Sequence, residues 1–378
     1  MVFLIRNVGV GGFGGGEIYQ LKLAKELKKA GFVPVIVTNS RELLKRANRL
    51  GFKTLVPPYM KNQNWSGWRN ALLPIYFGYI WRLKKWYEDI FKYHKPSVIN
   101  IQSRDDFLAA TMAGRKYGIR ILWTDHADFR NWVLWNVNVK YKNTIGKEIV
   151  KLSRYADKVI FVSKKVKEET EKMIKPIVIH NDIVIENGVI DEKRDYDNIK
   201  TIKTSFVFVG RVAEEKGIAE LVAAFRIVLK KHVDARLNIY GDGEDMAKYK
   251  KVADGNRQII FHGRTDEPLK AMAENDIFVL PSYREGLSLS LLDAAMMEKK
   301  IIASDVDGNS EVVKNGETGL LVPAKNVEKL AEAMIWMLEN PEEAEELAKN
   351  ARKYYERNFN FEKIFAEKML PLYNIEKE

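Results

Sequence analysis

Apolar and polar positions follow two different periods along the first part of the chain. Val2–Ile5 is a short apolar run of buried-strand type, and apolar residues then recur at three- and four-residue steps from residue 18 to residue 27. Gly31 ends this helical pattern, and a second apolar run begins at Val33. The order strand, helix, strand predicts a β–α–β unit with a parallel sheet.

The same alternation continues to about residue 185. Strands are expected at residues 33–38, 97–102, 120–124, 159–162 and 177–185, with helices at 106–117 and 147–154. Residues 191–203 are polar, charged and without period, which is typical of a linker.

A second series of the same kind starts at Ser205. Strands are expected at residues 206–209, 236–240, 259–261, 277–280 and 301–303, with helices at 218–231, 244–252, 268–274 and 288–297. Helical patterns at 327–338, 342–357 and 361–373 follow. Two open α/β sheets in tandem bind ligands at the carboxyl ends of their strands, most simply in the cleft between two domains.

Composition narrows the possible classes of protein. The 378 residues are 46% hydrophobic and 30% charged, which excludes wholesale disorder. The absence of cysteine excludes disulfides, thiolate nucleophiles and cysteine-based metal sites. The longest charge-free apolar run, residues 71–81, is far shorter than the roughly 20 residues that span a bilayer, and Met1 to Arg6 lack the basic start of a signal peptide. We therefore expect a cytoplasmic protein, in solution or on a membrane surface.

Charge is unevenly distributed. The net charge is +11, with +19 in residues 1–180 and −8 in residues 181–378. A basic half suggests a polyanionic partner such as nucleic acid, an anionic membrane or a phosphorylated ligand, although a solvated lysine-rich surface gives the same count.

A glycine-rich loop follows the first strand. Gly9, Gly11 and Gly14 fit the pattern G-x-G-x-x-G between a strand and a helix, which suits a phosphate at a helix N-terminus. A dinucleotide site also needs an acid at the end of the second strand, where this chain has Thr38-Asn39-Ser40. An NAD(P)-dependent oxidoreductase and a turn without a ligand remain alternative interpretations.

Charged residues follow two strands of the second half. Gly210-Arg211 comes directly after strand 206–209, and Lys216 lies in the same loop just before a helix. Two cations and a helix N-terminus favour a diphosphate site. Glu285 follows strand 277–280, and Asp293 lies about two helical turns further on. Carboxylates so placed accept hydrogen bonds from sugar or ribose hydroxyls.

These motifs, with residues 240–243, 304–313 and 316–322, resemble the donor domain of retaining glycosyltransferases of family 4. The first half resembles the same family at residues 15–17, 124–126, 162–163 and 187–189. The resemblance implies an α/β fold of two Rossmann-like domains facing a cleft, the GT-B arrangement. It implies an acceptor-side domain at 1–190, a nucleotide-sugar domain at 191–358, and a C-terminal helix, 359–378, that crosses back to the first domain.

The resemblance also implies roles for individual residues. Arg211 and Lys216 would hold the diphosphate, Glu285 would contact the donor sugar, and His126 would lie near that sugar. Asp293 stands where the family has a ribose-binding glutamate, so its carboxylate is one methylene shorter. The implied catalytic set is His126, Glu285, Arg211 and Lys216, and the implied donor-binding set is Gly15, Gly16, Gly210, Arg211, Lys216, Arg264, Glu285, Gly286, Leu287, Ser288 and Asp293.

The implied reaction is transfer of a sugar, with retention, from a nucleoside diphosphate to a glycan or a lipid-linked acceptor, with UDP favoured over GDP. Arg211, Lys216 and backbone N–H groups would stabilise the charge on the leaving diphosphate without a metal. Asp305-Val306-Asp307 has the form of a metal-binding D-x-D, but it occupies the position of the family's glycine-rich loop. No cofactor, metal or nucleic-acid partner is therefore expected, and a non-catalytic sugar- or polyanion-binding protein is a further alternative.

Aromatic and basic residues are concentrated between residues 65 and 95. Four of the eight tryptophans lie there: Trp65, Trp68, Trp81 and Trp86. A helix opening near Pro74 would have one apolar face, formed by Leu72, Ile75, Tyr79, Leu83, Trp86 and Ile90, with Phe77 and Trp81 outside it beside Lys84 and Lys85. Packing on the first sheet and peripheral contact with an anionic membrane are both compatible with this pattern.

Overall fold

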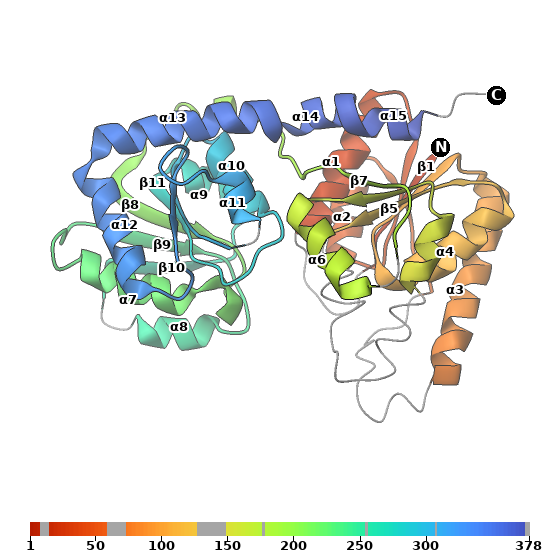
Figure 1. Cartoon of the computed structure of the whole chain (residues 1–378), viewed down its shortest axis with the longest axis horizontal. Coiled ribbons are helices and arrows are strands. Elements are labelled where there is room, and N and C mark those ends of the chain that lie inside the picture. Colours follow the sequence, from red (N-terminus) through yellow and green to blue (C-terminus); the bar gives the residue numbers. More distant parts are fainter. Residues whose placement is uncertain are drawn as a thin grey trace. The chain divides into compact units, whose positions relative to one another are not determined.

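The structure is a computed structural model that describes residues 1–7, 15–58, 73–126, 149–175, 178–253, 256–306 and 308–374. The chain divides into two compact units: unit 1 is Met1–Glu186 with Phe365–Glu378, and unit 2 is Asn187–Ile364. The glycines at 9, 11 and 14, Trp65, Trp68 and Asp307 lie outside the described residues. Each unit is a parallel sheet covered by helices (Figure 1).

Unit 1 contains a seven-stranded sheet in the order β3-β2-β1-β4-β5-β6-β7, and all its strand pairs are parallel. Its strands are β1 (Val2–Ile5), β2 (Pro34–Val37), β3 (Lys53–Leu55), β4 (Val98–Ile101), β5 (Arg120–Asp125), β6 (Lys158–Phe161) and β7 (Asp182–Val184). Its helices are α1 (Gly15–Lys29), α2 (Arg41–Arg49), α3 (Leu73–His94), α4 (Arg104–Lys116), α6 (Lys164–Ile174) and α15 (Leu370–Tyr373), with a 3-10 turn at Leu152–Tyr155 and a π-helical turn at Phe365–Met369.

Unit 2 contains a six-stranded parallel sheet in the order β10-β9-β8-β11-β12-β13. Its strands are β8 (Ile202–Val209), β9 (Arg236–Tyr240), β10 (Ile259–Gly263), β11 (Asn275–Leu280), β12 (Lys300–Ser304) and β13 (Leu320–Val322). Its helices are α7 (Ile218–Val228), α8 (Met246–Val252), α9 (Pro268–Ala273), α10 (Leu289–Met296), α11 (Asn309–Val312), α12 (Val327–Glu339), α13 (Pro341–Asn358) and α14 (Phe361–Ile364), with 3-10 turns at Lys193–Tyr196 and Glu214–Lys216.

The expected strand–helix alternation is present in both units. Strands β8 and β11 are neighbours at the centre of the second sheet, and every residue of β11 is buried. Because burial on both faces requires a continuous apolar run, the central strands were the easiest elements to predict. The linker expected at 191–203 is shorter than predicted, since β8 begins at Ile202.

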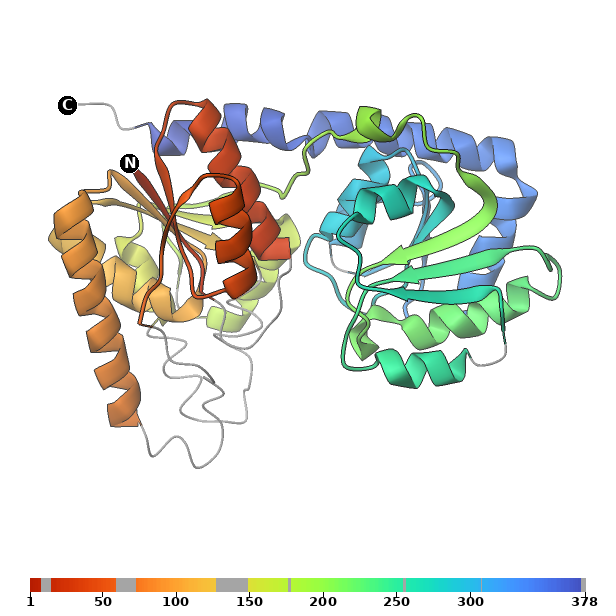
Figure 2. The ribbon, with the colours of Figure 1, turned by 180° about the vertical axis from the view of Figure 1, so that it is seen from behind.

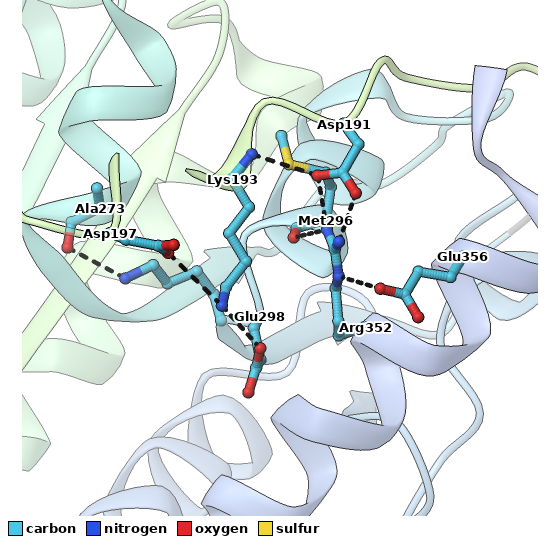
Figure 3. A network of polar contacts seen from close by, with 9 residues as sticks. Asp191, Lys193, Asp197, Ala273, Met296, Glu298, Arg352 and Glu356 are labelled. Carbon is cyan, nitrogen blue, oxygen red and sulfur yellow. Dashed lines mark hydrogen bonds and ion pairs between the residues drawn. The ribbon is translucent and has the colours of Figure 1, made fainter. Parts of the chain in front are cut away.

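The start of that linker is fixed to unit 2 by charged side chains (Figure 3). Arg352 of α13 donates to the Asp191 carboxylate through both terminal nitrogens and to the carbonyl of Met296, 2.6 Å away. Nζ of Lys193 lies 3.0 Å from Oε2 of Glu298. The polar composition of this stretch therefore reflects ordered ion pairs as well as solvent exposure.

Helix α3 buries most of the face that its pattern indicated. Tyr79 and Leu83 are buried and Trp86 and Ile90 pack against the core, whereas Ile75 is 52% exposed. The buried face also includes Tyr76 and Tyr87, which the pattern did not indicate. The hydroxyls of Tyr76 and Tyr87 donate to the buried Asp105 and Asp106 of α4, at 3.0 and 2.6 Å. These carboxylates satisfy the tyrosine hydroxyls inside the core, which allows tyrosines to replace aliphatic residues there.

The C-terminal segment, Phe365–Asn374, packs on unit 1 and lies beside α1 (Figures 1 and 2). Tyr373 is buried, and its hydroxyl accepts from Nδ2 of Asn100 at 2.7 Å. The hydroxyl of Tyr19 in α1 lies 3.7 Å from Sδ of Met369. The end of the chain is thus integrated into the first sheet's structure through buried polar contacts.

Candidate active site

Four loops converge at the carboxyl ends of the strands of unit 2. The loop after β8 carries Gly210, Arg211 and Lys216, and the loop after β11 carries Glu285. Because β8 and β11 are parallel neighbours, their following loops emerge side by side at one edge of the sheet. The loops after β9 and β12 join them through glycines.

The closest contact between the first two loops is an ion pair. Nζ of Lys216 lies 2.5 Å from Oε1 of Glu285, and the two side chains are only 20% and 10% exposed. The hydroxyl of Ser282 donates to the same carboxylate oxygen at 2.7 Å. The ion pair places one cation and one carboxylate, largely shielded from water, at the edge where a ligand of this sheet would bind.

Backbone contacts hold the same two loops together. The N–H of Tyr283 donates to the carbonyl of Glu215 at 2.8 Å, and the Tyr283 hydroxyl lies 2.8 Å from both carboxylate oxygens of Glu220. Burial, together with this hydrogen bond to Glu220, raises the pKa of Tyr283 well above its usual value, so the hydroxyl stays protonated. Gly217 has φ of +67°, and a Cβ there would lie 2.1 Å from the carbonyl oxygen of Pro281.

Glycines permit equally close approaches of the other two loops. A Cβ at Gly241 would lie 1.7 Å from the carbonyl oxygen of Gly210, and one at Gly308 would lie 1.3 Å from that of Gly286. The N–H of Gly210 donates to the carbonyl of Tyr240 at 3.0 Å. The loops after β8, β9, β11 and β12 therefore pack closely against one another. Their backbone groups, as well as their side chains, lie at the carboxyl-terminal edge of the sheet.

The other expected donor residues occupy this region with differing burial. Arg211 pairs with Glu215 four residues on and is 60% exposed at its side chain. Ser288 is the N-cap of α10 and its hydroxyl accepts from the N–H of Leu291. Asp293 is half-buried on the same helix, and Arg264 is exposed after β10. Leu287 is buried between Gly286 and the helix cap.

Among the expected residues of unit 1, His126 lies directly after β5 and is held by neighbouring side chains. The His126 ring meets the Tyr19 ring edge-on with centroids 4.7 Å apart, and its Nε2 lies 3.3 Å from Oε1 of Gln102. Burial, assisted by the positive charge of Arg6, lowers the pKa of His126 well below its usual value. The imidazole is consequently neutral at physiological pH.

Arg6 connects His126 to the start of α1. Its Nε lies 2.7 Å from Oε1 of Glu17, and its Nη1 donates to the carbonyl of Gln102 at 3.1 Å. A Cβ at Gly16 would lie 2.2 Å from Cζ of Arg6, so the guanidinium rests against the glycine backbone. Gly15 is exposed at the first position of α1.

Sequence reasoning missed several residues of both regions. Arg6, Tyr19 and Gln102 surround His126, and Ser282 and Tyr283 support Glu285. Gln102 lies 24 residues from His126 in sequence, and Ser282 has no distinctive motif of its own. Only the position directly after a strand, shared by Arg6 and Gln102, could have indicated them.

Within the described residues, no group of three or more histidine, aspartate or glutamate side chains is placed to hold a metal ion. Asp305 is exposed at the end of β12, and its N–H donates to the carbonyl of Val322 at 2.7 Å. Among the helices in the described ranges, none is both long and apolar enough to cross a bilayer.

Comparison with known proteins gives a consistent result. Residues 13–193 match Glycosyltransferase Family 4, and residues 189–354 match Glycosyl transferases group 1. An uncharacterized glycosyltransferase of Methanocaldococcus jannaschii is 32% identical over 240 residues, 60% of each chain, so the match spans about three fifths of that relative's length.

Two solved structures share the fold over nearly their whole length. A glycosyltransferase from Rickettsia africae has a TM-score of 0.77 at 20% identity, covering 98% of this chain and 97% of that one. The Anabaena protein HepE, in complex with UDP-glucose, has a TM-score of 0.75 at 16% identity, covering 98% of this chain and 97% of that one. The two parallel sheets and these structures show the GT-B fold, and the two family matches, which together span residues 13–354, show that the chain belongs to the family 4, group 1 glycosyltransferases.

Proposed function

We propose that the chain transfers a sugar, with retention of anomeric configuration, from a UDP-sugar to a glycan or lipid-linked acceptor. The observation that carries this proposal is the Lys216–Glu285 ion pair at the edge where four glycine-rich loops converge. A shielded cation can bind diphosphate, and a carboxylate 2.5 Å away can bind sugar hydroxyls. The UDP-glucose complex of HepE, which has the same fold, supports a UDP-sugar as the donor.

The proposed chemistry follows from the charges that change during transfer. The bond between the anomeric carbon and the β-phosphate oxygen breaks, and a bond to the acceptor oxygen forms. The acceptor proton passes to the departing phosphate oxygen. Lys216, Arg211 and backbone N–H groups of the glycine loops would stabilise the charge that develops on the diphosphate, because fixed donors in a shielded site need no reorganisation.

The remaining residues take roles consistent with their positions. Glu285 would hold the donor sugar, and Asp293 and Arg264 would contact the nucleoside. In unit 1, neutral His126 would hydrogen-bond the transferring sugar, and the backbone at Gly15 and Gly16 would approach the reacting phosphate. Members of the family typically need no metal, and we propose the same for this chain, with no other cofactor.

A membrane-proximal acceptor is supported by the exposed face of α3. Phe77 is 58% exposed and Trp81 is 63% exposed, and Nζ of Lys85 lies 5.6 Å from the centroid of the Trp81 ring. Exposed aromatics beside cations suit the headgroup region of an anionic bilayer. We therefore propose peripheral contact of this face with the membrane, from the cytoplasmic side.

Incubation with UDP-glucose in EDTA tests the proposed activity. We expect slow release of UDP with water as the acceptor, and the α-anomer of glucose as the first product in the proton NMR spectrum. A parallel incubation with NAD and simple hydroxy acids serves as the comparator. NADH formation without any UDP release would favour the oxidoreductase alternative instead. Tight UDP-glucose binding without turnover would favour a sugar-binding protein.

A further inference from the structure

A chain of buried polar side chains connects His126 to the C-terminal segment. Nε2 of His126 lies 3.3 Å from Oε1 of Gln102, and Nε2 of Gln102 donates to Oδ1 of Asn100 at 3.3 Å. Nδ2 of Asn100 donates to the hydroxyl of Tyr373 at 2.7 Å. Gln102 and Asn100 have no exposed surface, and Tyr373 is 1% exposed. The four residues form one continuous path from the edge of the sheet to the last helix.

The direction of each amide in this chain is set by its neighbours. Oδ1 of Asn100 accepts from the hydroxyl of Thr124 at 3.1 Å as well as from Gln102, while its Nδ2 faces Tyr373. Gln102 therefore turns its donor nitrogen toward Asn100 and its acceptor oxygen toward His126. An acceptor at this position requires that Nε2 of His126 carry the hydrogen, which leaves Nδ1 with the lone pair.

An aromatic contact makes a second connection to the same segment. The Tyr19 ring packs edge-on against the His126 ring, and the Tyr19 hydroxyl contacts Sδ of Met369. Met369 and Tyr373 are one turn apart in the C-terminal segment, and both are buried. The C-terminal segment, about 245 residues after His126 in sequence, is therefore linked to it in two ways. One is the series of hydrogen bonds through Asn100 and Gln102, and the other is the packing of Tyr19.

Burial of the uncharged polar groups of Asn100, Gln102 and Tyr373 in the core costs free energy. Buried amides lose hydrogen bonds with water, and an apolar set of similar volume would pack on this face of the sheet without that loss. Such networks impose one orientation on their members, because each must satisfy its neighbours. In this hydrogen-bonded series, His126 is the terminal residue at the edge of the sheet.

We propose that Tyr373 is a positioning residue, which acts through Asn100 and Gln102 to fix the orientation and the tautomer of the His126 ring. The contribution of His126 to sugar transfer rests on the proposed function. The orientation and the tautomer of the His126 ring do not depend on the proposed function, so they can be measured independently of catalysis.

The test is nitrogen NMR of protein labelled at its five histidines, with His126→Gln used to assign the His126 signals. Neutral tautomers differ in which ring nitrogen has the shift of a protonated atom. We expect wild-type His126 to be a single tautomer protonated at Nε2. In Tyr373→Phe we expect signals averaged between both tautomers, and the same in Gln102→Met, which removes the acceptor itself.

Tyr355→Phe is the matched control. Tyr355 is also a fully buried tyrosine whose hydroxyl makes one hydrogen bond, to the carbonyl of Val189 at 2.8 Å, but it lies in unit 2. Its loss should leave the His126 signals unchanged. His126 protonated at Nδ1 in the wild type, or unchanged His126 signals in Tyr373→Phe, whatever Gln102→Met shows, would overturn the proposal.

A kinetic measurement separates this proposal from the proposed function. UDP affinity should be unchanged in Tyr373→Phe, while UDP release from UDP-glucose should fall on the order of tenfold, as expected when a support of a site residue is lost. Absence of activity in the wild type would contradict the proposed function but would leave the tautomer result standing. Full activity in Tyr373→Phe together with an altered tautomer would overturn the positioning role in transfer.

Discussion

Lys216 and Glu285 lie 69 residues apart in sequence, and their side chains meet with 2.5 Å between Nζ and Oε1. Each belongs to a loop that follows a central strand of the second sheet, so strand pairing brings them together. The pair balances charge when no ligand is bound. A diphosphate bound by Lys216 would leave the Glu285 carboxylate available for the sugar hydroxyls. Lys216 and Glu285 would then bind different parts of one ligand.

Replacement of Glu285 tests the second half of this assignment. Glu285→Gln keeps the size of the side chain but removes its charge and weakens its hold on hydroxyl groups. We expect UDP affinity to remain, and turnover of UDP-glucose to fall by about 10²-fold, the scale for loss of a group that acts mainly in the transition state.

Initial-rate measurement of UDP release gives the turnover. Glu332→Gln, in the exposed ion pair with Lys329, is a matched control and should have the wild-type rate. Equal rates in Glu285→Gln and the control would remove Glu285 from the donor site.

A methyl group at Gly217 should disrupt the packed loops. Gly217→Ala places a side chain at a φ of +67° and sets Cβ 2.1 Å from a backbone oxygen of Pro281. Strain and displacement together should destabilise the protein by about 2–4 kcal/mol and weaken UDP binding. Denaturant unfolding measures the first effect and calorimetry the second.

Gly118→Ala provides the comparison, since Gly118 has φ of +62° but no atom within 4 Å of its added Cβ. It should cost only about 1 kcal/mol and leave UDP binding intact. Similar losses in both variants would show that the contact with Pro281 has no consequence.

The low pKa of His126 gives the stability a pH dependence. The pKa is well below 6.5 in the folded protein and near 6.5 in the unfolded chain, so the unfolded state binds a proton first as the pH falls. This contribution is fully present above about pH 6.5 and is lost progressively below it. His126→Gln should therefore reduce the fall in the free energy of unfolding between pH 7 and pH 5. Identical pH profiles for variant and wild type would show that His126 is not held neutral.

Membrane contact through α3 should depend on both aromatic and basic residues. Wild-type protein should sediment with anionic vesicles more than with neutral ones, and less at high salt, because the attraction is partly electrostatic. Phe77→Ser with Trp81→Ala should weaken this binding several-fold. Ile260→Ala, at an exposed apolar residue of unit 2, should not. Equal binding to neutral and anionic vesicles, or none to either at low salt, would contradict the membrane proposal.

Sequence patterns predicted most of the central strands because those strands are continuous apolar runs. They did not indicate α2, in which only Leu43 and Ala47 are buried, the helix α6, or the three-residue strands β3 and β13. The patterns indicated Tyr79 and Leu83 on the buried face of α3 but not Tyr76 and Tyr87, whose hydroxyls donate to Asp105 and Asp106 of α4. No local pattern contains information about such partners.

The two candidate regions differ in how far sequence could specify them. Lys216 and Glu285 follow strands and carry charge, so both their location and their chemistry were expected. The support of His126 comes from Gln102, Asn100 and Tyr373, whose residue types are common. Gln102 lies 24 residues from His126, and Tyr373 lies 273 residues from Asn100. Only the folded arrangement shows that these residues form one chain.

The most direct test of the central claim is calorimetry of UDP binding in EDTA, with wild type and Lys216→Ala measured side by side. Lys329→Ala, which removes an exposed lysine of the same unit, is the control, and NAD is the comparison ligand. We predict UDP binding to the wild type and to the control, a loss of at least tenfold in affinity in Lys216→Ala, as expected for a charge-assisted contact, and no heat with NAD. Unchanged UDP affinity in Lys216→Ala, or binding of NAD in place of UDP, would contradict a nucleoside diphosphate site at the Lys216–Glu285 pair.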